Sequence, residues 1–384
     1  MSTVPQNRKS LGKMNTTGCD SEPAVCISGS RVEDPAVGVP HEGVEIAPLG
    51  VESVAEWDAY VDRHPQSSLY HSSVWHGVIQ EVFGHEVIRL AARDAAGLAG
   101  VLPLVRLRSR LFGDYMVSMP FFNYGGALAR SEALARQLMS VAGEEARRVG
   151  CGHVEFRDTV AHEGWMVRTD KVAMQLKLPG TYEQLWGALG AKLRAQIRRP
   201  QKEGAEVLRG GAEFLPQFYA VFARNMRDLG TPVYSRSFFE AILRALPDSA
   251  SIVLVRHKRR PVAAGFLLGF RNGLEIPWAS SLREYNPLGV NMLMYAETLK
   301  AAIESGYRVF DFGRSSIDSG TYRFKKQWGA SAQQLYWHYW LAENREMPQL
   351  TPGNPKYQLA IAAWRRLPVC IANGLGPMIV KYLP

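Results

Sequence analysis

The stretch Gly320-Thr321-Tyr322-Arg323-Phe324-Lys325-Lys326-Gln327-Trp328-Gly329 places two adjacent lysines between two aromatic residues. It follows a strand-like run over residues 307–313 and precedes another over residues 334–341. A cation beside apolar ring surfaces is poorly screened, so it can stabilise a developing oxyanion or a phosphate. The alternative is a solvated turn with two surface lysines, and the spacing alone does not decide between them.

This stretch resembles the C-terminal signature of the FemAB family, in which Gly-x-x-x-Phe-Lys-x-x-Trp/Phe-Gly follows a strand, here residues 309–313. Residues 286–295 and the basic run over residues 192–199 also fit that family, and the likeness extends from about residue 65 to about residue 342. FemAB proteins are aminoacyl and acyl transferases built from two GNAT-like halves. The sequence is most similar to the branch found with exosortase and PEP-CTERM exopolysaccharide systems.

The resemblance implies an α/β (α+β) fold with two tandem GNAT-like (acyl-CoA N-acyltransferase) domains. The sequence independently shows one order of elements twice, namely hairpin, strand, loop, helix and strand, which suggests an internal duplication. The two copies begin near residues 86 and 251. We expect an N-terminal GNAT-like domain at 44–180, a C-terminal GNAT-like domain at 181–345, and a basic C-terminal tail at 346–384.

Residues 1–43 are rich in Ser, Thr, Gly, Pro and Val, and the first aromatic residue of the chain is Trp57. A segment without aromatic residues buries little surface, which predicts a disordered leader. We find no signal peptide pattern and no apolar run of about 18 residues that predicts a spanning helix. The four cysteines lack metal-ligand spacing and are interpreted as unpaired thiols in a reducing compartment. The expected location is therefore cytoplasmic.

The net charge of +9 over 384 residues favours an anionic partner. Such a partner could be a nucleic acid, a phosphorylated or lipid-linked glycan, or an anionic membrane face, and the charge does not choose among the three. The tail from about residue 351 carries four basic residues and no acidic one. Its apolar part is short and interrupted, so it either docks on the protein or lies at the inner face of the membrane.

Asp311 and Lys325 are the candidate catalytic residues. Strand alternation places Asp311 on the face opposite Phe310 and Phe312. There it orients the attacking amine, accepts the proton of that amine, or is a structural partner of Arg314. The resemblance implies that Lys325 contacts the oxyanion or a donor phosphate, that Phe324 holds this lysine, and that Arg323 and Arg314 contribute to substrate binding.

Two loops that each precede a helix are candidate binding sites. Gly289 and Asn291 lie at a helix N-terminus, whose free N–H groups suit a phosphate or carboxylate. In GNAT enzymes the equivalent Arg-x-x-Gly-x-Gly/Ala loop binds the pyrophosphate of coenzyme A. Here only Gly289 matches that loop, which fits an aminoacyl-tRNA donor better. Tyr124, Gly125 and Gly126 occupy the equivalent loop of the first half, which the resemblance assigns to the acceptor; a plain turn is the alternative.

A basic helix is the third candidate. Residues 181–199 are predicted to be largely helical and to end at Pro200, and Arg194 and Arg198 share one face because they are four residues apart. They either bind phosphates of a tRNA or a glycan lipid, or form a solvated face. Motifs for a zinc helix, a Walker loop or a nucleophilic serine are absent from the sequence, so we expect neither a metal nor a tightly bound cofactor.

The sequence is therefore interpreted as a transferase that forms an amide. An acceptor amine on a cell-envelope or exopolysaccharide precursor attacks the activated carbonyl of an aminoacyl-tRNA or acyl-CoA donor. The alternatives are an acyl-CoA-dependent N-acyltransferase and a catalytically silent subunit that binds glycan or nucleic acid.

Overall fold

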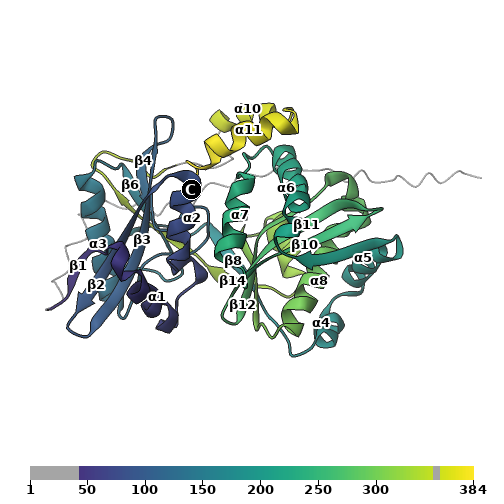
Figure 1. Cartoon of the computed structure of the whole chain (residues 1–384), viewed down its shortest axis with the longest axis horizontal. Helices are drawn as coiled ribbons and strands as arrows, with labels where there is room; N and C mark the ends of the chain where they lie inside the picture. The colour runs from purple at the N-terminus through teal and green to yellow at the C-terminus, as the bar shows by residue number, and fades with distance from the viewer. Residues whose placement is uncertain (1–42, 349–354) are drawn as a thin grey trace, which may run out of the picture.

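The computed structural model describes residues 43–348 and 355–384. For residues 355–357 it describes the backbone alone. The predicted leader therefore lies outside the described residues except for Gly43. Figure 1 shows two β-sheets with helices packed against them, one in each half of the molecule, and two C-terminal helices across one end.

Within the described residues the first sheet has eight strands and the second has seven. In pairing order, the first sheet contains β1 (Glu45–Pro48), β2 (Glu86–Asp94), β3 (Gly97–Ser109), β4 (Gly113–Val117), β6 (His153–Asp158), β15 (Tyr336–Leu341) and β7 (Met166–Arg168), while β5 (Leu128–Ala129) pairs with β3. The second contains β14 (Ser331–Gln334), β8 (Lys171–Lys177), β13 (Val309–Ser316), β12 (Gly273–Ser281), β11 (Arg260–Phe270), β10 (Ala250–His257) and β9 (Ala205–Gly210).

The two sheets follow the same plan. In each, an antiparallel hairpin leads to a strand that pairs in parallel with the strand after the next helix, β4 with β6 and β12 with β13. The connecting helices are α3 (Glu132–Arg148) and α8 (Val290–Glu304). Strands that pair in parallel need such a crossover connection. The repeated order that the sequence shows is therefore also a repeat of topology.

The two sheets divide the chain near residues 170 and 335, because the strands of the second sheet run from Lys171 to Gln334. β8, from the expected N-terminal domain, pairs with β13 and β14 of the second sheet. β15, from the expected C-terminal domain, pairs with β6 and β7 of the first sheet. The expected domain boundaries at residues 180 and 345 therefore do not separate the two sheets, because hydrogen bonding between distant strands decides to which sheet a strand belongs.

Helices cover both sheets. The others are α1 (Val54–Arg63), α2 (Val74–Phe83), α4 (Tyr182–Ala188), α5 (Ala191–Lys202), α6 (Leu215–Leu229), α7 (Arg236–Ala245), α9 (Gly320–Lys326), α10 (Pro355–Trp364) and α11 (Val369–Val380). One hydrophobic cluster runs through both halves, and the rings of Phe83 in α2 and Phe238 in α7 are 5.1 Å apart within it. The halves are thus joined by a packed apolar interface.

The prediction that Pro200 ends its helix is wrong, because α5 continues to Lys202. Proline has no N–H group, so it cannot donate to the carbonyl of Gln196, four residues earlier. That carbonyl lies against Gly289, where a Cβ atom would be 2.8 Å from the Gln196 oxygen. The close approach of α5 to the turn before α8 therefore requires a glycine at position 289, which also has a φ of +86°.

The basic tail docks on the protein, which was one of the two alternatives for it. Arg227 of α6 donates to the carbonyl of Leu367 at 2.7 Å. The Tyr115 hydroxyl of β4 donates to the carbonyl of Tyr382, also at 2.7 Å. The tail thus contacts both halves, as the yellow helices in Figure 1 show.

Candidate active site between the two halves

Asp311 and Glu275 lie side by side where two parallel strands separate. β12 and β13 pair over three residues, and Glu275 opposite Asp311 is the last pair although both strands continue. Phe310 and Phe312 point into the hydrophobic core of the second half, so alternation turns Asp311 to the other face. The divergence therefore exposes two carboxyl groups to the interface between the halves.

Side chains from the first half bind both carboxyl groups. The Tyr70 hydroxyl donates to Glu275 at 2.6 Å, and the Tyr124 hydroxyl donates to Asp311 at 2.5 Å. Within the second sheet, the Gln175 amide of β8 also donates to Asp311, at 3.0 Å, and the Gly313 N–H at 2.6 Å. Asp311 is therefore held by hydrogen bonds and does not pair with Arg314, which was the structural alternative for it.

Burial changes the protonation of this pair. The pKa of Glu275 is raised to about 8, by desolvation first and by the charge of Asp311 second, while the hydrogen bond from Tyr70 acts in the opposite direction. Desolvation also raises the pKa of Asp311, against the hydrogen bonds from Tyr124, Gln175 and Gly313. Two adjacent buried carboxyl groups do not both ionise easily, and the three hydrogen-bond donors around Asp311 favour the charged form of Asp311 over that of Glu275.

Lys325 lies next to the carboxyl pair. It is buried in α9, and its Nζ donates to the carbonyls of Gly313 at 3.0 Å and Arg314 at 2.7 Å. Burial lowers its pKa to about 8, while Asp311 and Glu275 act to raise it. An ammonium group has three N–H donors, so one remains for a ligand. The stretch that contains Lys325 is therefore a helix whose lysine points inward, not a solvated turn.

The Phe324 ring packs against other aromatic rings beside α9, and no contact of the Lys325 ammonium group with its face is found among the described residues. Its ring packs 5.1 Å from that of Tyr295 and 6.5 Å from that of Trp328. The expectation that aromatic rings hold the charge is therefore corrected: backbone carbonyls of β13 hold it. Arg323 is exposed, and its guanidinium donates to the carbonyl of Asp318.

A cavity of about 410 Å³ adjoins the carboxyl pair. Its wall includes Tyr124 and Gln175, the two side chains that bind Asp311, together with Gly125 and Gly126. Both glycines are required there, because a Cβ atom would be 2.6 Å from Met119 Cβ at position 125 and 1.8 Å from Asp158 Oδ1 at position 126. The structure therefore brings the loop of residues 124–126 together with Asp311.

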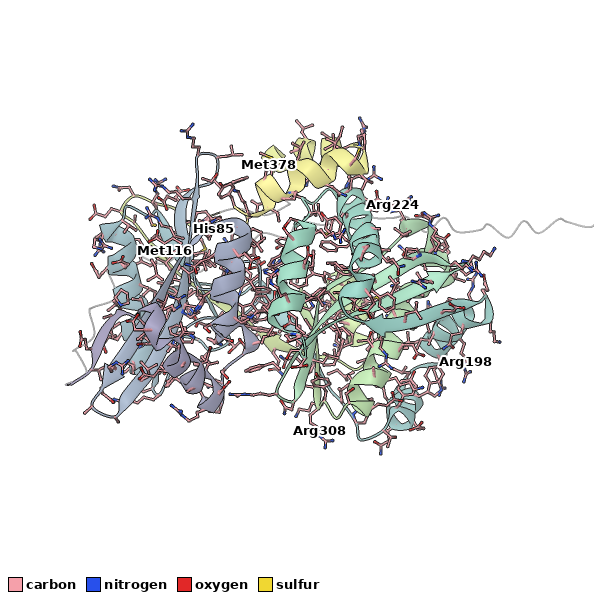
Figure 2. The ribbon with its side chains drawn as sticks, in the orientation of Figure 1. His85, Met116, Arg198, Arg224, Arg308 and Met378 are labelled. Atoms are coloured by element: carbon pink, nitrogen blue, oxygen red, sulfur yellow. The ribbon has the colours of Figure 1, made fainter. Side chains whose placement is uncertain are left out.

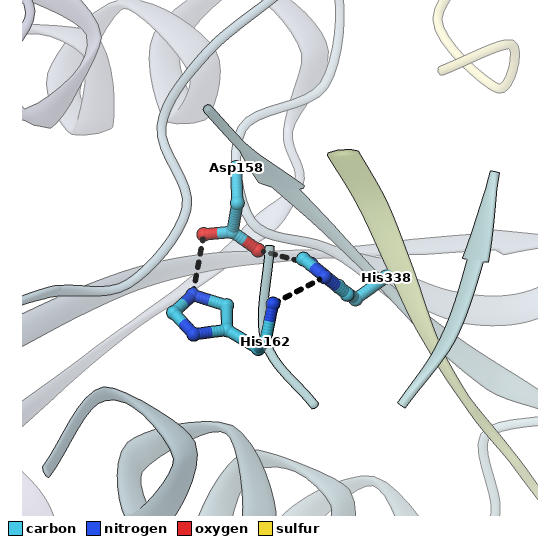
Figure 3. A group of neighbouring side chains, drawn as sticks. All are labelled: Asp158, His162 and His338. Atoms are coloured by element: carbon cyan, nitrogen blue, oxygen red, sulfur yellow. Dashed lines mark hydrogen bonds and ion pairs between the residues drawn. The ribbon is translucent and has the colours of Figure 1, made fainter. Parts of the chain in front are cut away.

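Asp158 and His162 also line this cavity, and with His338 they have the spacing of metal ligands (Figure 3). The Nε2 of His338 accepts from the His162 backbone N–H at 3.0 Å, so its Nδ1 must carry the proton that it donates to Asp158 at 2.9 Å. Both ring nitrogens of His338 are thus in use. Asp158 also accepts from the Ala127 N–H at 3.0 Å, so the group holds the end of the loop over residues 124–127 rather than offering a set of free metal ligands.

The loop before α8 is poorly suited to a pyrophosphate. The Gly289 N–H donates to the carbonyl of Asn286 at 3.0 Å, and the Asn291 side chain accepts from the Met292 N–H at 2.9 Å. These groups at the N-terminus of the helix already have partners within the protein, and α5 packs against the turn. Gly289 and Asn291 thus make local contacts, and their part in substrate binding stays a prediction.

The remaining predicted residues make no hydrogen bond to the carboxyl pair among the described contacts. Arg194 is half-buried and Arg198 is exposed on α5, with the guanidinium of Arg198 5.0 Å from the ring centre of Trp186 (Figure 2). Arg314 is exposed, with its guanidinium 5.0 Å from the ring centre of Trp337. The basic helix and the carboxyl pair are thus separate features.

Sequence reasoning missed Glu275, Tyr70 and Gln175. Glu275 lies in an otherwise apolar strand, which is a signal that was available. Tyr70 and Gln175 carry no local signal, because they reach the site through contacts between residues 205 and 136 positions apart.

Comparison with known proteins supports this architecture. Residues 191–326 match the family model described as acetyltransferase (GNAT) domain. No curated protein matches the chain.

Several solved structures share the fold. One is the crystal structure of FemX, 16% identical, with a TM-score of 0.61 over 83% of this chain and 100% of that one. Another is a tandem GNAT protein from the clavulanic acid biosynthesis pathway, which is 12% identical. Its TM-score is 0.52, and the match covers 79% of this chain and 100% of that one. A third is the C-terminal domain of a candidate lysylphosphatidylglycerol synthetase from Agrobacterium fabrum, which is 14% identical. Its TM-score is 0.52, and the match covers 75% of this chain and 91% of that one. The predicted fold of two tandem GNAT-like halves is confirmed.

Proposed function

We propose that this protein is a FemAB-type N-acyltransferase that joins an aminoacyl or acyl group to an amine. The observation that carries the proposal is the buried pair of Asp311 and Glu275 beside Lys325, next to a cavity formed by the other half. The GNAT domain match and the fold shared with FemX support it. The acceptor, an amine on a cell-envelope or exopolysaccharide precursor, and the exosortase-associated branch rest on the sequence resemblance.

The chemistry needs only an acceptor for a proton and a donor to an oxyanion. In the proposed step the amine nitrogen bonds to the donor carbonyl carbon, and Asp311 accepts the proton that the amine loses. The free N–H of Lys325 stabilises the negative oxygen of the tetrahedral intermediate. The ester bond then breaks, and the leaving oxygen takes the proton.

The proposed donor is an aminoacyl-tRNA. The filled hydrogen bonds at Gly289 and Asn291 disfavour a coenzyme A pyrophosphate there, and α5 offers an exposed basic face instead. The GNAT domain match favours the second candidate, an acyl-CoA donor. A tRNA donor is cytoplasmic, which agrees with the proposed location at the inner face of the membrane.

Charge reversal on α5 tests the donor. Replacing Arg194 and Arg198 by glutamate is expected to weaken tRNA binding strongly and to reduce the slope of log K against log salt by about two, since each lost phosphate contact removes about one unit. The measurement is tRNA binding at several salt concentrations.

The matched control for this test replaces Arg110 and Arg308, which are exposed elsewhere, by glutamate and makes the same change in net charge. This control should bind tRNA nearly as wild type does. Tight coenzyme A binding that the α5 variant keeps, with no tRNA binding at low salt, would replace the tRNA donor by an acyl-CoA donor.

We also propose that the tail contacts an anionic membrane surface. Among the described residues, no helix is long and apolar enough to cross a bilayer. However, α10 and α11 leave apolar side chains in solvent, because Leu359 is 82% and Met378 65% exposed. Figure 2 shows Met378 on these helices. Arg365 and Arg366 lie between them and are exposed. Apolar side chains flanked by basic ones suit the surface of anionic lipids.

Co-sedimentation with vesicles tests this contact. The protein is expected to sediment with phosphatidylglycerol vesicles and not with phosphatidylcholine vesicles, and Leu359→Ser with Met378→Ser should reduce binding severalfold. Val51→Ser is the control, since Val51 is 73% exposed at the N-terminal end of the first half. Equal binding of all three proteins would exclude the tail as the contact.

A further inference from the structure

The hairpin between β3 and β4 projects from the first half as a narrow arm. Figure 1 shows it extending beyond the sheet toward the end of the molecule where α10 and α11 lie. Ser109 and Gly113 are register partners, so a turn of three residues closes the arm. Below the turn, Arg106 binds Asp114 through two hydrogen bonds of 2.8 and 2.7 Å. A bidentate pair of this kind constrains both side chains, so the two strands are held together close to the tip.

The turn directs one leucine into solvent. The Ser109 hydroxyl accepts from the N–H groups of Leu111, at 3.1 Å, and Phe112, at 3.3 Å, which folds the chain back on itself. Phe112 then packs against the hydrophobic cluster that runs through both halves. Leu111 stays at the tip, where it is 80% exposed. Local hydrogen bonds therefore hold an aliphatic side chain outside the protein.

Arginines flank this leucine. Arg106 and Arg108 alternate with the buried Leu107 along β3, and Arg110 begins the turn. The Arg108 side chain is 78% exposed, and Arg110 is exposed as well. Asp114 is the one acidic residue in the sequence from 106 to 114, and it is shared between Arg106, at 2.7 Å, and Arg108, at 3.6 Å. The tip therefore carries an excess of positive charge next to an apolar side chain.

This combination suits a lipid surface better than a nucleic acid. A nucleic acid would bind the arginines, but its bases stack on aromatic rings and gain little from an aliphatic tip. The headgroups of an anionic bilayer attract guanidinium groups, and the acyl region below them accepts a leucine. The exposed apolar and basic side chains of α10 and α11 present the same combination at the same end of the molecule. One exposed leucine alone would need no partner, but here two separate elements share the pattern.

We propose that the tip of the β3–β4 hairpin, residues 108–112, inserts into an anionic lipid surface as a second contact beside the tail. The inference rests on the proposed membrane association and adds to it a contact from the first half. Leu111 enters the acyl region, while Arg108 and Arg110 bind headgroups. Two contacts from different parts of the chain fix the rotation of the protein on the bilayer, which a single contact does not.

Co-sedimentation with phosphatidylglycerol vesicles tests the hairpin separately from the tail. Leu111→Ser is expected to lower the bound fraction severalfold, because it removes the inserted side chain. Arg108→Gln with Arg110→Gln should lower it severalfold at physiological salt. The matched control is Lys258→Gln with Arg259→Gln, an equal loss of charge in the exposed turn between β10 and β11. This control should bind as wild type does.

A fluorescent label at the tip distinguishes insertion from adsorption to headgroups. Leu111→Cys is labelled with the fluorophore NBD in a chain whose exposed Cys370, together with Cys19 and Cys26, is replaced by serine. Its emission should shift to the blue with phosphatidylglycerol vesicles and stay unchanged with phosphatidylcholine vesicles. The same label on Ile317→Cys, at an exposed position of the second half, should not respond to either.

The outcomes separate the hairpin from the tail. Vesicle binding that both hairpin variants leave unchanged, or a label at position 111 that does not respond, overturns the hairpin contact and leaves the proposed tail contact standing. Weaker binding of the hairpin variants together with unchanged binding of the tail variant supports the hairpin and excludes the tail. Failure of the wild-type protein to bind phosphatidylglycerol vesicles overturns both. Because no donor or acceptor is needed, these results are independent of whether the protein transfers acyl groups.

Discussion

Replacing Lys325 by methionine is expected to lower the rate of transfer on the order of 100-fold to 1000-fold, the usual effect of losing one group that stabilises an oxyanion. Methionine keeps most of the buried chain and removes the ammonium group that lies between β13 and the carboxyl pair. The measurement is steady-state transfer with a fixed donor. Lys326→Met is the matched control, because Lys326 is exposed with its charge over the Tyr322 ring, and its rate should stay near wild type.

Two further measurements separate the roles of Lys325. The ammonium group also binds two carbonyls of β13, so thermal melting is needed to show that the variant is folded at the assay temperature. Donor binding that survives in Lys325→Met indicates the oxyanion role, whereas its loss indicates contact with a donor phosphate. A folded variant with a rate within about threefold of wild type contradicts both roles, since either one predicts a much larger loss.

Replacing Asp311 by asparagine is expected to lower the rate by about 100-fold to 10,000-fold, the range for removal of a general base. Asparagine has the same shape, so the contacts of Tyr124 and Gln175 with this position are disturbed as little as any substitution allows. Glu275→Gln is the matched control. Glu275 is protonated at neutral pH because its pKa is about 8, and glutamine resembles that neutral form, so its effect should be much smaller.

The pH dependence of the rate gives a second readout. An aspartate base works only when ionised, so the rate falls as the pH is lowered through the pKa of Asp311. Because burial raises that pKa, this fall should occur above the range of an ordinary aspartate. The fall should be missing in Asp311→Asn. If Asp311→Asn keeps the wild-type rate and the fall of the rate at low pH, the role of Asp311 is structural and not catalytic.

Local sequence signals were sufficient for the elements that each half builds by itself. Ser131 caps α3, because its side chain accepts a hydrogen bond from the Leu134 N–H. The alternation of apolar residues around Asp311 identified the correct face of β13. The motif around Lys325 also led to the right neighbourhood. These features depend on residues within a few positions of one another, and periodicity reports on such distances.

The rest depends on contacts between distant parts of the chain. Nothing in residues 171–177 indicates that β8 joins the second sheet rather than the first. The partnership of Tyr124 with Asp311 spans 187 residues, and that of Trp337 with Arg157 arises only once β15 has paired with β6. Helix propensity also misplaced the end of α5, since Pro200 is accommodated there by the packing of Gly289 against the Gln196 carbonyl.

The second sheet is built from one uninterrupted stretch of the chain, because all its strands lie between Lys171 at the start of β8 and Gln334 at the end of β14. The first sheet is divided around that stretch. β7 precedes it, and β15 follows it and returns to an interior place between β6 and β7. Truncation of the chain before β15 would therefore leave the strands of the second sheet complete and would separate β7 from the rest of the first sheet.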